Sequence, residues 1–212
     1  CGTMDGLSCF YEDTFTWYTT KNGLTHNTVI SLMEDARGNI WAGTYHGISV
    51  FSRGTFTGYT TRNGLPNNFI HSMIRDFEGN TWIGTSGGLS FLRSFNPKMY
   101  TDKNGLTGKA VRDIIEDRNG RFWIGTSGGL NCIANGKITA YTTANGLVSD
   151  SINTLHEDWD GDIWIGTGEG VSVLSPGTGT CTNYSAANGL PGRSTFRVAA
   201  VILNYSACTT VS

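Results

Sequence analysis

The sequence predicts an all-β protein, and three observations favour this class. The segment DRNGRFWIGTSGGL at 117–130 returns in similar form at 35–48, 76–89 and 158–171. Glycine is frequent, with 29 residues, whereas proline occurs 4 times. Phenylalanine, tryptophan and tyrosine together make up 11% of the 212 residues. Glycine-rich turns between aromatic and β-branched runs are typical of short antiparallel strands.

The repeat predicts the architecture. Trp41, Trp82, Trp123 and Trp164 stand at a constant spacing of 41 residues. One unit resolves into four expected strands, at 28–35, 39–44, 47–52 and 55–61. Four antiparallel strands in about 41 residues make one blade of a β-propeller. Both faces of a blade pack on neighbouring blades, which explains strands such as VISLM that are apolar on both sides.

The residues that every repeat keeps are interpreted as structural. The short carboxylate that precedes each tryptophan can tie down the turn between the first two strands, and the glycine after it can take a positive φ. The tryptophan is expected to wedge between blades. These positions are Asp35, Asp76, Asp117 and Asp158, with Trp41, Trp82, Trp123 and Trp164. The run DWDGD at 158–162 lacks the full ligand set of a calcium loop, so we expect no metal and no cofactor.

The two ends of the chain suggest how a ring would close. Residues 1–10 align with 42–51, so the chain opens within a blade, and the tail at 194–212 offers a further strand. We expect one domain over 1–212, a five-bladed propeller in which 1–21 and 194–212 form the closing blade. Such a composite blade leaves no long free edge. An open fragment of a larger ring, for example one of seven blades, is the alternative.

The charge, the hydropathy and the cysteines of the chain narrow the classes of protein to which it can belong. A net charge of −2 and a pI near 6.1 provide no basic surface for nucleic acid. No segment is long and apolar enough to span a membrane. The chain starts with Cys1 rather than methionine, so we expect a mature or trimmed product. Cys9 and Cys132 occupy the position of Val50 and are expected in the core. A disulfide between Cys1 and Cys208 stays open.

The motifs also resemble a known family. The text NGL, an apolar strand that ends in Glu-Asp or Arg-Asp, then Gly-x-x-Trp-x-Gly-Thr, covers residues 1 to about 190. These repeats resemble the two-component regulator propeller repeats of bacterial sensor proteins. The resemblance implies a β-propeller in a periplasmic or extracellular sensor region, where many relatives sense oligosaccharides. The chain is shorter than the long arrays of that family and carries no kinase or regulator segment.

Variable loop positions are the candidate ligand site. Residues that differ between repeats on a shared surface are free to contact a ligand, and polar groups with an aromatic ring suit a sugar. The candidate ligand-binding residues are His26, Asn27, Tyr45, His46, Asn67, Asn68, Lys109, Asp150, Glu169 and Arg193, with Tyr45 and His46 as the leading pair. His71, Arg112 and Asn153, equivalent to Ile30 in the first strand of each blade, are expected to line the channel.

Three function classes remain. The main prediction is a non-catalytic binding or sensing module for an oligosaccharide or another small polar ligand. A structural or assembly module, which contacts a protein partner or a second copy of itself, is the first alternative. A propeller lyase or hydrolase is the second, with His71, His156 or Glu169 as a base. No catalytic constellation is apparent in the sequence, so we predict no enzymatic activity and assign no catalytic residues.

Overall fold

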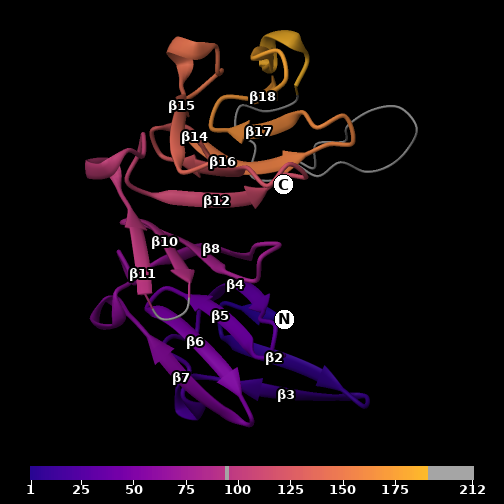
Figure 1. Cartoon of the computed structure of the whole chain (residues 1–212). Coiled ribbons are helices and arrows are strands. Elements are labelled where there is room, and N and C mark those ends of the chain that lie inside the picture. The colour runs from indigo at the N-terminus through magenta and orange to yellow at the C-terminus, as the bar shows by residue number, and fades with distance from the viewer. Residues whose placement is uncertain (94–95, 191–212) are drawn as a thin grey trace. The chain divides into compact units, whose positions relative to one another are not determined.

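The protein is described from a computed structural model, which places residues 1–93 and 96–190. These residues fall into two compact units, Cys1–Thr101 and Asp102–Ser212, which we describe separately. Both units are built from antiparallel sheets joined by short turns (Figure 1). The predicted closing blade relies on residues 194–212, and Arg193 was a predicted site residue. Both lie outside the described residues, so the closing blade stays a prediction.

The first unit contains three sheets. A three-stranded sheet comprises β1 (Gly2–Thr3), β2 (Gly6–Tyr11) and β3 (Thr14–Tyr18). A four-stranded sheet follows, with β4 (Val29–Glu34), β5 (Ile40–Thr44), β6 (Gly47–Ser52) and β7 (Thr55–Tyr59). The next comprises β8 (Ile70–Arg75), β9 (Thr81–Thr85), β10 (Gly88–Arg93) and β11 (Asn96–Tyr100).

The second unit contains two four-stranded sheets. The first comprises β12 (Val111–Glu116), β13 (Phe122–Thr126), β14 (Gly129–Ala134) and β15 (Lys137–Tyr141). The second comprises β16 (Ile152–Glu157), β17 (Ile163–Thr167), β18 (Val171–Ser175) and β19 (Thr180–Tyr184). The all-β propeller class is therefore confirmed, because the repeats form five blade-like sheets with the expected strands in the expected order.

The aspartate and the tryptophan that recur in each repeat are joined by a hydrogen bond. The carboxylates of Asp35, Asp76, Asp117 and Asp158 accept hydrogen bonds from the indole nitrogens of Trp41, Trp82, Trp123 and Trp164 at 3.1, 3.0, 2.8 and 2.7 Å. Each carboxylate also accepts the backbone N–H four residues on, which closes the turn between the first two strands. These bonds agree with the turn interpretation, and the bond to the indole fixes a ring that is buried in Trp82 and Trp123 and half-buried in Trp41 and Trp164.

The NGL motif caps a short turn after the last strand of a blade. In the first copy, Asn22 Oδ1 accepts the backbone N–H of Thr19 at 2.9 Å. Gly23 then takes the left-handed conformation with φ 107°, which glycine adopts without steric cost. Leu24 is buried at 4% exposure. The motif thus provides an acceptor for a backbone N–H of the turn, reverses the direction of the chain and anchors it in the core through the leucine.

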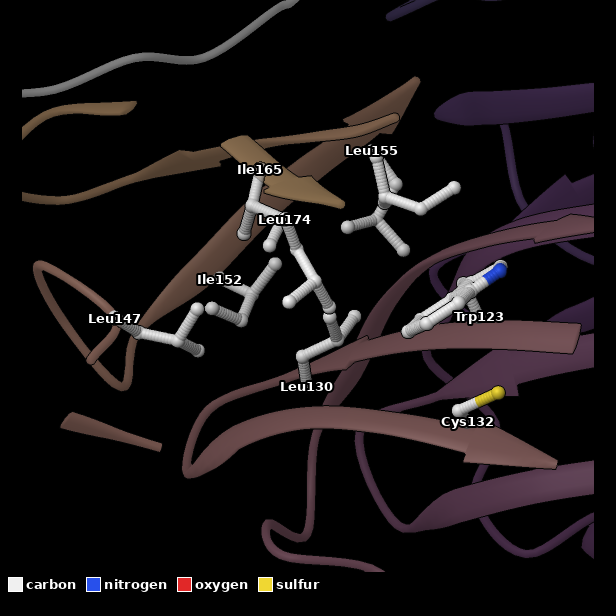
Figure 2. Packing of buried hydrophobic residues seen from close by; sticks show 9 residues of the cluster. Trp123, Leu130, Cys132, Leu147, Ile152, Leu155, Ile165 and Leu174 are labelled. Carbon is white, nitrogen blue, oxygen red and sulfur yellow. The ribbon is translucent and has the colours of Figure 1, made fainter. Parts of the chain in front are cut away.

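Apolar side chains fill the space between successive blades. In the second unit one cluster joins Trp123 and Leu130 of the first sheet to Ile152, Ile165 and Leu174 of the second. Figure 2 shows these side chains converging between the two sheets. Trp123 is 1% exposed, so its ring removes a large apolar area from water, consistent with the predicted wedge.

The cysteine expectations are half right. Cys132 is buried beneath Trp123, its partner across the β13–β14 ladder, and burial raises the pKa of its thiol to about 11. Cys9 is exposed, so its assignment to the core is wrong. The physical reason is that no described residue pairs with Cys9 on the β1 side of its strand, whereas Trp123 lies opposite Cys132. Cys1 carries a free thiol, and Cys208 lies outside the described residues.

Candidate functional site

In three of the blades, the loop that enters the first strand is held by its own polar side chain. Asn27 Oδ1 accepts the N–H of Thr20 at 2.8 Å, and Asn68 Oδ1 accepts that of Thr61 at 2.8 Å. Asp150 Oδ1 does the same for Thr143 at 2.7 Å. These three candidate ligand residues therefore brace the short turn that follows the preceding strand. The sequence analysis did not assign them this role, although their shared place in the repeat could have suggested it.

A second set of loop positions closes a smaller turn. His26 Nδ1 accepts the N–H of Thr28 at 3.0 Å, and Asn67 Oδ1 accepts that of Phe69 at 2.8 Å. Side-chain acceptors that bind the backbone two residues on are typical of such turns. Because His26 Nδ1 accepts a hydrogen bond, Nε2 is the ring nitrogen left to donate to a ligand.

Four rings form a row across two blades of the first unit, which we call the aromatic row: His26, Tyr45, Phe69 and His71. Tyr45 stacks on His26 at 5.7 Å between ring centroids and on Phe69 at 4.3 Å. Phe69 continues to His71 at 4.7 Å. Since two rings stack on Tyr45, which is 39% exposed, its hydroxyl group and ring edge are the parts left for a ligand.

The backbone explains why the aromatic row forms. Val29 pairs with Thr44, so the start of β4 and the turn after β5 lie at the same end of that sheet. The N–H of Gly47 donates to the carbonyl of Asn68 at 2.6 Å, which joins the same turn to the loop of the next blade. Phe69 was missed by the sequence analysis. Its signal was an aromatic side chain where the other repeats have Thr28, Ala110 and Ser151.

The predicted channel positions share a backbone irregularity. Each first strand shifts register between Val29 and Ser31, Ile70 and Ser72, Val111 and Asp113, or Ile152 and Thr154. The residues skipped by these shifts are Ile30, His71, Arg112 and Asn153, the same set that the sequence analysis selected. A β-bulge changes the direction of the side chain of the extra residue. The side chains of these four residues are therefore oriented differently from those of their neighbours in the same strand.

Two of the bulge residues bind each other in the second unit. Arg112 donates to Asn153 Oδ1 at 2.6 Å and to Ser151 Oγ at 2.9 Å. In the first unit, His71 Nε2 lies 2.9 Å from Ser86 Oγ. The remaining candidates stand apart from these contacts: His46, Lys109 and Glu169 are exposed. The structure thus groups His26, Tyr45, Asn67 and His71 in one unit and Arg112 with Asn153 in the other.

Within residues 1–93 and 96–190, no three His, Cys, Asp or Glu side chains gather in a group that could hold a metal ion. In the same part of the chain no helix is long and apolar enough to cross a membrane. His156 lies in β16 opposite Trp164, whereas Glu169 is in the turn after β17. The groups that the structure brings together at the site are hydrogen-bonding side chains and aromatic rings.

The fold and the site define a propeller-type repeat protein. Its sequence and structure resemble those of known proteins. The family model of the two-component regulator propeller matches residues 23–46, 64–87 and 105–128. These segments carry two-component regulator propeller repeats, which confirms the resemblance drawn from the sequence. No curated protein is similar enough in sequence to count as a match.

Solved structures with similar folds include the following three proteins. The extracellular domain of BT3049, assigned to a hybrid two-component system of B. thetaiotaomicron, is 26% identical with a TM-score of 0.79; the match covers 95% of this chain and 29% of that one. PorZ, a surface component of the type-IX secretion system of Porphyromonas gingivalis, is 16% identical with a TM-score of 0.73, over 94% of this chain and 34% of PorZ. Virginiamycin B lyase from Staphylococcus aureus is 16% identical with a TM-score of 0.67, over 91% of this chain and 65% of the lyase.

Coverage and identity limit what these likenesses show. The chain spans less than a third of the BT3049 domain, with 29% of that domain covered. At 16% identity, PorZ and the lyase show the fold alone.

Proposed function

We propose that this chain is a non-catalytic sensing module that binds a small polar ligand, with a carbohydrate as the favoured class. The aromatic row carries the proposal. It presents the Tyr45 hydroxyl group and an imidazole donor at one end of two neighbouring blades, and the exposed His46 follows Tyr45 in the chain. Planar hydrogen-bonding groups next to aromatic rings suit sugar hydroxyls and C–H faces.

The relatives support a sensing or regulatory role outside the cytoplasm. BT3049 is the extracellular domain of a protein assigned to a hybrid two-component system. We therefore place this chain in the periplasm or outside the cell. The lyase and hydrolase alternative has weaker support, because the likeness to the lyase, at 16% identity, concerns the fold alone.

A thermal-shift screen against a panel of oligosaccharides tests this function. A ligand at 100 times its Kd stabilises a protein by about 2.7 kcal/mol, and each kcal/mol moves the midpoint of a chain of this size by roughly 2–4 °C. A selective shift that the double variant Tyr45→Ala, His46→Ala abolishes would support the proposal. The exposed Trp159 provides the control variant Trp159→Ala, which should keep the shift. A panel without any shift for a cooperatively folded protein would contradict the proposal.

An assembly role is the second candidate, and one observation favours it. The hairpin of β2 and β3 exposes four aromatic side chains: Phe10 at 59%, Tyr11 at 71%, Phe15 at 60% and Trp17 at 56%. Exposed aromatic patches of this kind are typical of protein–protein contact surfaces. A native mass measurement of the purified chain, alone and with candidate partners, would separate this role from a ligand-binding monomer.

A further inference from the structure

One arginine of the second unit has no acidic partner. The described part of this unit contains three arginines, and two of them form ion pairs: Arg118 with Glu157 at 3.0 Å and Arg121 with Asp117 at 2.6 Å. Arg112 is half-buried in β12 and forms no ion pair with any residue that the structure describes. Charged side chains that leave water are normally paired, so the charge of this guanidinium group is left uncompensated.

Neutral groups hold the guanidinium group in place. Arg112 Nη1 donates to Asn153 Oδ1 at 2.6 Å, to Ser151 Oγ at 2.9 Å and to the carbonyl of Ile152 at 3.4 Å. These acceptors lie at the start of β16, the first strand of the adjacent blade in the same unit (Figure 1). The contacts therefore fix the direction of the arginine side chain without neutralising its charge.

The other edge of the guanidinium group is left for a ligand. The three hydrogen bonds all use Nη1, whereas Nε and Nη2 of Arg112 donate to no residue in the described part of the chain. These two nitrogens form an edge of arginine that matches both oxygens of a carboxylate. The acid next in sequence, Asp113, binds the backbone instead, because its Oδ1 accepts the N–H of Ile114 at 2.9 Å and its Oδ2 that of Leu155 at 2.8 Å.

The place of Arg112 in the repeat agrees with a role in ligand binding. Arg112 lies at the register shift of its first strand, where the other four-stranded blades have Ile30, His71 and Asn153. Blades with an isoleucine or an asparagine form the same register shift, so the shift itself does not require a cation. The charge of Arg112 is therefore left without a structural explanation in its own blade.

We propose that Arg112 binds the carboxylate group of a small ligand, with Nε and Nη2 donating to its two oxygens. Asn153 and Ser151 are positioning residues, because they orient the guanidinium group. A sugar acid, such as a uronic acid unit of an oligosaccharide, and a small carboxylic acid that is not a sugar share this chemistry. The sugar-acid form rests on the proposed sugar-binding function, whereas the carboxylate site itself shares no residue with the aromatic row.

The test compares acids with neutral molecules of similar skeleton on the full chain. Digalacturonate is compared with galactobiose, and succinate with succinamide, at equal ionic strength. Binding is measured by calorimetry and by the Nε–H signal of Arg112 in nitrogen–proton NMR spectra, which is assigned by its absence in Arg112→Lys. We expect at least one acid to bind saturably and to shift that signal. Its neutral counterpart should bind about 10-fold more weakly or worse, as expected for hydrogen bonds to a charged group.

Two substitutions test the site in different ways. Arg112→Gln removes the charge and should weaken binding of the acid about 10-fold or more. Asn153→Asp keeps the arginine but places a carboxylate at the position of Oδ1, 2.6 Å from Nη1. It should neutralise the guanidinium group, repel the ligand and weaken binding even where Arg112→Gln does not fold. The control Lys137→Gln removes an exposed charge of β15 and should change the Kd by less than about 2-fold, because salt screens such charges.

The outcomes separate this inference from the proposed function. Binding of digalacturonate, of succinate or of both would identify a sugar acid, a non-sugar acid or the carboxylate group alone as the feature that Arg112 recognises. Equal binding of galactobiose and digalacturonate would leave the sugar-sensing proposal standing and overturn the carboxylate site. Absence of binding by both acids would overturn the carboxylate site, as would binding that survives both substitutions at Arg112 and Asn153.

Discussion

The carboxylate of Asp117 lies 2.8 Å from the indole nitrogen of Trp123, which follows six residues later in the chain. Both side chains are buried, at 0% and 1% exposure. The same carboxylate pairs with Arg121 at 2.6 Å and accepts the backbone N–H groups of Asn119 and Arg121. One side chain thus connects the turn, the core and the surface of a blade.

Replacement of this carboxylate should strongly destabilise the protein. Asp117→Ala leaves a buried indole N–H and two backbone N–H groups without their acceptor, which we expect to cost about 2–4 kcal/mol. For a chain of this size that lowers the thermal midpoint by about 5–15 °C. Asp160→Ala, at an exposed position in the turn of another blade, should change the midpoint by less than about 2 °C. An equal effect of the two variants would argue against the role given to Asp117.

Acid should destabilise the fold through the same turns. Burial opposes ionisation of Asp35, but hydrogen bonds from Asn39, Trp41 and the backbone outweigh it and lower its pKa from 3.8 to about 2. For Asp117, hydrogen bonds from Trp123 and Arg121 likewise outweigh burial and lower the pKa. A lowered pKa stabilises the folded state fully above the unfolded value of about 3.9 and less as the pH falls towards the folded value.

Urea midpoints measured between pH 7 and pH 2 test this prediction. We expect stability to fall from about pH 4 downwards as these carboxylates take up protons. Asp35→Asn has no titrating group at that position, so its midpoint should fall less steeply over the same range. A variant that follows the wild type in parallel would show that Asp35 does not contribute to the acid sensitivity.

The glycine of the NGL motif should not tolerate a side chain. Gly146 has a φ of 99°, and a Cβ there would meet the side chain of Cys181 at an ordinary 3.6 Å. Gly146→Ala is therefore opposed by the backbone conformation rather than by crowding, at about 1–2 kcal/mol. Gly177, with open space around it and no left-handed φ, provides the control. Urea midpoints should fall for Gly146→Ala and stay near the wild-type value for Gly177→Ala.

The fold was largely predictable because its signals are local and repeated. The spacing of the tryptophans predicted blades, and Asp35 at the turn was correctly interpreted from its distance to the following glycine. Comparison between repeats also singled out His71, Arg112 and Asn153 as equivalent positions, which share a register shift; that they line a channel stays a prediction. A pattern cannot show what a side chain binds, and for that reason the hydrogen bond between Arg112 and Asn153 became visible only in three dimensions.

The sequence alone determined the class of fold, the order of the strands and the residues that each blade requires, because those residues act within their own turn or ladder. The tertiary structure decided which variable residues meet. Phe69 joins Tyr45 to His71 only because two loops 24 residues apart in the chain lie at the same end of adjacent blades. The tertiary structure also decided that Cys132 is buried and Cys9 is exposed, because burial depends on the neighbouring strand rather than on the residue itself.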